Sequence, residues 1–186
     1  KAALVNTTTG KSISVLTEPK TEMGMKAVKD GWAEQHPDEW WKYVCNATKR
    51  LLKENNIDSQ NITGIGISYQ MHGLVVVDKK GIPLRDSIIW CDSRAVGIGQ
   101  KAFETLGEEK CTTQLLNSPS NFTASKLKWV KDNEPEVYAR IHKFMLPGDY
   151  IAYKLGNTIC STTSGLSEGI FWDFNKNSIA DWLLDH

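Results

Sequence analysis

The chain has 186 residues, and its 22 lysine and arginine residues balance its 22 aspartate and glutamate residues, so the formal net charge is zero. This balance excludes a nucleic-acid binder that relies on bulk positive charge, and it excludes an acidic disordered tail. No apolar run approaches the ~20 residues of a membrane span. The four cysteines form no CxxC pair, which argues against a zinc site and fits reduced thiols in a cytoplasmic protein.

Short apolar runs near the amino terminus predict a β-hairpin. Residues 2–5 and 14–17 are apolar and flank a polar turn at 6–10, whereas residues 18–36 are polar and predict a long loop. A helix is predicted from residue 36 to about residue 55. A proline and acidic residues occupy its first turn, and apolar residues then recur along one face.

The middle of the chain predicts three strands. Isoleucines alternate with small residues over 61–68, which indicates a buried strand. Residues 74–77 and 87–90 predict two more strands, separated by a turn at 78–81. Together these segments indicate a compact β unit.

The rest of the chain is predicted to be mainly helical, because apolar residues recur at helical spacing between glycines, prolines and polar loops. The predicted helices cover residues 93–107, 111–116, 123–133, 135–141, 149–155 and 179–184, with an extended segment at 144–147.

The first candidate site is the quartet Gln70-Met71-His72-Gly73, which lies directly between two predicted strands. Strand ends hold side chains on a rigid support. An imidazole can donate a hydrogen bond to a hydroxyl or carbonyl oxygen and can accept one from a hydroxyl group. The alternative interpretation is an ordinary hairpin turn with a surface histidine.

Two further segments are candidates. Trp90 ends a predicted strand and is followed by Asp92 and Arg94, and Asn121 begins a segment that leads into a predicted helix. For both, helix capping is the alternative, with an Asp–Arg pair in the first. No phosphate loop of the form GxxxxGK[ST], no HExxH motif and no GxSxG motif occurs, so the residues predict no metal site.

Several segments together resemble the FGGY family of carbohydrate kinases, in the same order along the chain. Those segments are Gly31-Trp-Ala-Glu-Gln-His-Pro-Asp-Glu-Trp-Trp41, Gly66-Ile-Ser-Tyr-Gln-Met-His-Gly73, Ile88-Ile-Trp-Cys-Asp-Ser-Arg94, Asn121-Phe-Thr-Ala-Ser-Lys-Leu-Lys-Trp129 and Leu146-Pro-Gly-Asp-Tyr150. The second is similar to the sugar-site signature of xylulokinases within that family, and its Met-His pair separates these enzymes from glycerol kinases.

The resemblance implies an α/β fold of the actin-like, ribonuclease-H-like class, with a mixed sheet flanked by helices. Residues 1–186 would form most of the amino-terminal, sugar-binding domain of a two-domain kinase, without the carboxy-terminal ATP-binding domain. By resemblance, Met71 and His72 contact the sugar, together with Gln70 beside them. Trp90 would wall the sugar pocket, and Asn121 would supply a polar contact.

The chain departs from the family pattern in two places. The family's opening strand carries D-x-G-T-x-x-x-K, of which only the last lysine is present, as Lys1, so we expect the first strand of the sheet to be missing. The family's catalytic aspartate lies in a G-x-x-D segment, which we expect beyond His186. None of Asp149, Asp173 and Asp181 fits that context, so the chain itself holds no predicted catalytic residue.

The resemblance therefore implies ATP-dependent phosphorylation of D-xylulose to D-xylulose 5-phosphate in a longer cytoplasmic protein, with this piece inactive alone. ATP and Mg²⁺ would be bound mainly by the other domain, which would be the main partner, and a homodimer is also possible within the family. No nucleic acid or membrane partner is expected. The alternatives are another FGGY pentulose kinase and a non-catalytic sugar-binding module.

Overall fold

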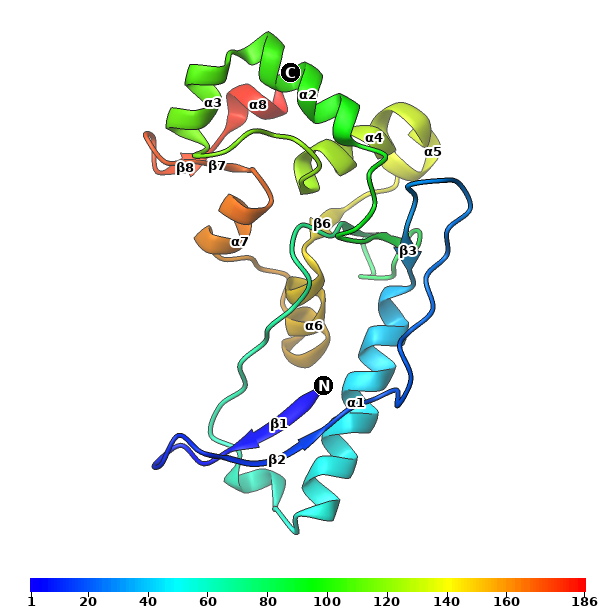
Figure 1. Ribbon diagram of the computed structural model, residues 1–186, viewed down its shortest axis with the longest axis vertical. Coiled ribbons are helices and arrows are strands. Elements are labelled where there is room, and N and C mark those ends of the chain that lie inside the picture. Colours follow the sequence, from blue (N-terminus) through cyan, green and yellow to red (C-terminus); the bar gives the residue numbers. More distant parts are fainter. The chain divides into compact units, whose positions relative to one another are not determined.

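The computed structural model describes all residues, Lys1–His186, and divides into two compact units (Figure 1). Unit 1 consists of Lys1–Gly24 and Asp38–Ile67, and unit 2 consists of Met25–Pro37 and Ser68–His186. No helix in either unit has both the length and the apolar character that crossing a membrane requires.

Unit 1 is a β-hairpin packed on a long helix. Strands β1 (Ala2–Val5) and β2 (Ser12–Leu16) pair antiparallel, and α1 (Pro37–Glu54) is followed by a short 3-10 turn at Ser59–Asn61. The predicted hairpin and the predicted helix are therefore both confirmed. The small core of this unit joins the two elements through Ala2, Leu4, Leu16, Ala47 and Leu51.

The buried strand predicted over 61–68 is wrong. The segment that follows the 3-10 turn has no regular structure, and Ile65 is 68% exposed. A strand needs a neighbour that accepts and donates its backbone hydrogen bonds, and no strand of the chain pairs with this segment. The alternating pattern marks residues that suit a strand, but it does not supply the partner.

Four short strands of unit 2 lie side by side. Strand β3 (Glu34–Gln35) pairs with β5 (Ser87–Ile88), and β4 (Val75–Val77) pairs with β6 (Lys143–Met145). A bridge from Leu74 to Ile88 connects the two pairs. Every pair in the chain is antiparallel, so the sheet that we expected to be mixed is present as separate antiparallel pairs.

Helices make up most of the rest of unit 2. They are α2 (Val96–Leu106), α3 (Glu108–Gln114), α4 (Thr123–Asn133), α5 (Pro135–Tyr138), α6 (Pro147–Gly156), α7 (Thr163–Glu168) and α8 (Asp181–Leu184), with a hairpin of β7 (Trp172–Asp173) and β8 (Ser178–Ile179). Helix α7 was not predicted from the sequence, because its residues are mostly small and polar. The Thr162 hydroxyl caps this helix by accepting the N–H of Gly165.

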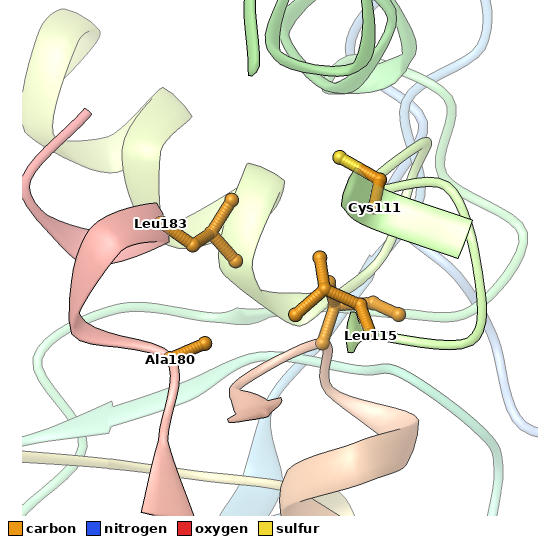
Figure 2. Close-up of a cluster of buried hydrophobic side chains, with 5 residues drawn as sticks. Cys111, Leu115, Ala180 and Leu183 are labelled. Atoms are coloured by element: carbon orange, nitrogen blue, oxygen red, sulfur yellow. The ribbon is translucent and has the colours of Figure 1, made fainter. Parts of the chain in front are cut away.

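Two apolar clusters hold unit 2 together. One joins the strands to α4 through Leu74, Val76, Ile88 and Val130. The other joins α3 to the carboxy-terminal helix, and its members are Cys111, Leu115, Ile170, Ala180 and Leu183. Figure 2 shows Leu183 and Ala180 pointing toward Leu115, so the end of the chain is anchored on α3.

Candidate functional site

The three candidate segments meet in unit 2. Residues 70–73 form the turn before β4, residues 90–94 follow β5, and residues 121–126 lead into α4 (Figure 1). The bridge between Leu74 and Ile88 brings the first two segments together, because it aligns the start of β4 with the end of β5. The predicted site residues therefore lie in one region, although they come from three distant parts of the sequence.

Gln70 links the first segment to the second. Its Oε1 accepts the backbone N–H of Trp90 at 3.1 Å. The side chains of Met71 and Trp90 are 57% and 53% exposed, so both present apolar surface to solvent. Such surface can pack against the C–H face of a small polar ligand.

His72 is held in a left-handed backbone conformation, with φ at 37°. The Glu168 carboxylate of α7 accepts the N–H of His72, which holds this turn in place. The imidazole packs edge-on against Phe122, with ring centroids 5.0 Å apart. Burial, reinforced by the positive charge of Lys126, lowers the pKa of His72 to about 4, so the ring is neutral at pH 7.

Gly73 allows the turn to pack closely on the start of α6. A Cβ atom at this position would lie 2.6 Å from Cγ of Pro147, which is closer than non-bonded carbon atoms approach one another in proteins. The glycine is therefore required by contact with a neighbouring ring, rather than by its own backbone angles.

Asp92 and Arg94 form a buried ion pair behind the site. Both carboxylate oxygens of Asp92 accept from the Arg94 guanidinium, and Oδ2 also accepts the N–H of Ala33 at 2.6 Å. The guanidinium packs against both Trp32 and Trp129, at 3.8 Å and 4.8 Å from the ring centroids, and the two indole rings contact each other edge-on. Of the alternative interpretation of this segment, the Asp–Arg pair is confirmed and the helix cap is wrong, because α2 begins only at Val96.

Asn121 does not cap α4. Phe122 is the N-cap residue, and Asn121 instead donates its side-chain N–H to the backbone carbonyl of Asp92. This contact ties the third segment to the second and fixes the orientation of the amide. Its Oδ1 is buried and has no hydrogen-bond partner within the chain, so an acceptor is left unsatisfied beside the second segment.

Sequence reasoning missed two polar residues of the site, Lys126 and Glu168. Lys126 lies within the third candidate segment but was not singled out, and its side chain is fully buried. Glu168 ends a helix that was not predicted, and burial raises the pKa of its carboxyl group. The only signal in the sequence for Lys126 was a lysine in the first turn of a helix whose neighbouring residues are largely buried. Nothing in the sequence connects Glu168 with residue 72.

No group of three or more histidine, cysteine, aspartate or glutamate side chains is arranged to hold a metal ion. Of the aspartates that lie late in the chain, Asp149 accepts the N–H of Leu146 at the start of α6, and Asp173 accepts the indole N–H of Trp182. Both therefore serve local structure, and the residues present do not fit a Mg²⁺ site.

The arrangement can bind a small polyhydroxylated molecule. It offers exposed apolar surface from a methionine and a tryptophan, a neutral imidazole and an unpaired amide oxygen. These groups can hold such a ligand through polar and apolar contacts.

Comparison with known proteins gives a consistent result. The amino-terminal domain of the FGGY family of carbohydrate kinases matches residues 1–185. A xylulose kinase of Staphylococcus epidermidis is 37% identical over 149 residues, covering 76% of this chain and 29% of the relative. A xylulose kinase of Staphylococcus xylosus is 33% identical, covering 98% of this chain and 38% of the relative.

Solved structures agree in fold. The crystal structure of a xyloylose kinase from Brucella ovis has a TM-score of 0.86 and 29% identity, and the match covers 98% of this chain and 37% of that chain. A ligand-bound xylulose kinase from Lactobacillus acidophilus has a TM-score of 0.85 at 23% identity, covering 98% of this chain and 36% of that chain. The predicted actin-like fold class is thereby confirmed. The chain spans about a third of the length of these relatives.

Proposed function

The chain belongs to the FGGY family of carbohydrate kinases, and on this basis we propose that it is most of the sugar-binding domain of a kinase acting on D-xylulose. The reaction would transfer the terminal phosphoryl group of ATP to a hydroxyl of the ketose and give D-xylulose 5-phosphate. Membership of a kinase family implies use of ATP and Mg²⁺, and we assign both mainly to a second domain outside residues 1–186. The four free thiols fit a reducing, cytoplasmic setting.

One observation carries the proposal. The turn bearing the Met-His pair, the exposed Trp90 and the unpaired oxygen of Asn121 come together from three separate segments. A ketopentose carries hydroxyl and carbonyl oxygens on successive carbon atoms, together with C–H groups. The site offers the matching groups, which are polar contacts from His72 and Asn121 and apolar contacts from Met71 and Trp90.

The contribution of this chain to catalysis is positioning. Phosphoryl transfer requires little covalent chemistry from the protein, and its rate depends on how the acceptor hydroxyl is oriented. We propose that these side chains hold the ketose while an aspartate in the other domain accepts the hydroxyl proton. At pH 7 the neutral His72 would bind sugar oxygens without adding charge next to the reacting phosphate.

The test compares the 186-residue chain with the longer protein proposed to contain it. ADP release is measured with D-xylulose, D-ribulose, L-fuculose and glycerol. We expect turnover with D-xylulose in the longer protein and none in the chain alone. Preference for another of these substrates would replace the ketose assignment, and sugar binding without turnover in the longer protein would identify a binding module.

A substitution tests the site itself. His72→Ala in the longer protein should raise the KM for D-xylulose about tenfold or more and leave the KM for ATP nearly unchanged, because a polar contact to the sugar is lost. The matched control is His142→Ala, since His142 is exposed and immediately precedes β6. An unchanged KM for D-xylulose in the His72 variant would contradict the assignment.

A further inference from the structure

Lys126 is a buried lysine without a carboxylate partner. Its side chain is fully buried, and its Nζ donates to the backbone carbonyls of His72 at 2.9 Å and Ile89 at 3.0 Å. The third neighbour of Nζ is Nδ1 of His72, at 3.4 Å. Burying an ammonium group is costly unless its donors are satisfied, and here three acceptors match its three protons.

These contacts have a consequence for the imidazole. An ammonium group can only donate hydrogen bonds, so Nδ1 of His72 faces it as an acceptor. A neutral imidazole carries one proton, and that proton must then lie on Nε2. Nε2 makes no hydrogen bond within the chain, and Phe122 packs against the ring with centroids 5.0 Å apart.

We propose that Lys126 is a positioning residue that fixes His72 in the Nε2–H tautomer, so that the site presents a hydrogen-bond donor to a ligand oxygen. A ligand that suits this group offers a lone pair, as the carbonyl or a hydroxyl oxygen of a sugar does. The use of that donor in sugar binding rests on the proposed function, but the tautomer itself does not.

The electrostatics of the surroundings agree with this arrangement. Burial lowers the pKa of Lys126 to about 8, while Asp92 and Cys91 favour its charged form and Arg94 opposes it, so the amine is still mostly protonated at pH 7. The other charged group at the turn, Glu168, also favours the charged form of Lys126, and its carboxylate accepts the backbone N–H of His72. Lys126 is thus the group that acts on Nδ1.

The tautomer can be measured directly. Two-bond ¹⁵N–¹H correlation spectra of the ¹⁵N-histidine-labelled chain distinguish Nε2–H from Nδ1–H, and loss of one signal set in His72→Asn assigns the residue. We expect His72 to be Nε2–H at pH 7, with Nδ1 unprotonated and hydrogen-bonded. Protonation at Nδ1 in the unsubstituted chain would overturn the proposal, without any need for a lysine variant.

Two substitutions separate the donor from the charge. Lys126→Met removes both, so the His72 pKa should rise by about one unit or more and both tautomers should be populated. Lys126→Gln keeps an N–H donor, so the pKa should rise while Nε2–H persists. The control is Lys128→Met, on the exposed side of the same helix, where Nζ pairs only with Asp132. If Lys126→Met does not fold, Lys126→Gln gives the answer, and an unchanged His72 pKa in it would contradict the proposal.

Sugar binding then distinguishes this inference from the proposed function. By calorimetry, Lys126→Met should weaken D-xylulose binding to the longer protein about tenfold, as loss of one oriented hydrogen bond does. An unsubstituted protein with the Nε2–H tautomer but no affinity for D-xylulose would contradict the proposed function and leave the role of Lys126 intact. Unchanged affinity in Lys126→Met, with D-xylulose bound normally by the unsubstituted protein, would show that the oriented donor is not used.

Discussion

Residues 62–67 and residues 74–77 are both rich in β-branched residues, yet they lie in opposite environments. Ile62, Ile65 and Ile67 of unit 1 are 38%, 68% and 37% exposed, whereas Val75–Val77 in unit 2 are at most 1% exposed. The second segment has β6 beside it and connects through Leu74 to β5, whereas the first has no strand beside it. The difference shows that β propensity reflects fit to a neighbouring strand and is not a property of the segment alone.

The largest expected effect comes from placing a charge in each segment. Val76→Asp puts a carboxylate into the cluster formed with Leu74, Ile88 and Val130, whose members are all apolar. We expect a loss of about 3–5 kcal/mol in the free energy of unfolding, because the charge is buried and unpaired. Ile65→Asp should change it by less than about 0.5 kcal/mol, because the side chain is already in water.

Urea denaturation measures both changes, and hydrogen exchange locates them. In Val76→Asp, exchange should accelerate first in β4 and β6, since these strands pair with each other. Equal destabilisation by the two substitutions would mean that residues 62–67 are buried in solution, and the contrast between the segments would then disappear.

Glycines give a second, smaller contrast. Gly73→Ala adds a methyl group 2.6 Å from the Pro147 ring, which cannot move easily, so we expect a loss of about 1–3 kcal/mol. At Gly64 the added methyl group meets nothing within 4 Å, so Gly64→Ala should be neutral or stabilise the chain by up to about 1 kcal/mol. Thermal unfolding of the two variants in parallel checks the pair, and a tolerated Gly73→Ala would show that the turn is not packed on α6.

The elements that were predicted correctly are those determined by residues close together in the sequence. The hairpin of unit 1, α1 and α4 are confirmed at or near their predicted bounds, because turn residues, an N-terminal proline and helical spacing act within a few residues. The strand at 61–68 was predicted wrongly because its outcome depends on a distant partner. Helix α7 was missed because its capping threonine resembles any other residue of a polar loop.

The residues of the candidate site were likewise predicted only in part. Met71, His72, Trp90 and Asn121 stood out because strand ends and family motifs mark them, and the structure brings their segments together. Their roles toward a sugar stay predictions. Lys126 and Glu168, which contact His72, were not predicted, because they are 54 and 96 residues away in sequence and meet it only through packing.

The smallest expected effect is a pH dependence confined to unit 2, which contains all four histidines of the chain. Folding lowers the pKa of His72 from 6.5 to about 4, so the folded state binds fewer protons than the unfolded state between these values. Stability from this group is therefore present above pH 6.5 and is lost as the pH falls toward 4. Because the ring is only partly buried, we expect a loss of about 1–2 kcal/mol.

Asparagine tolerates the left-handed backbone of this position, so His72→Asn removes the titration without new strain. Measured by urea denaturation, the stability of the unsubstituted chain relative to His72→Asn should fall between pH 7 and pH 4, while contributions from Glu168 and Asp149 cancel in the difference. A difference that is the same at both pH values would mean that His72 is solvated in the folded chain, and that the turn before β4 is as open to water as residues 62–67.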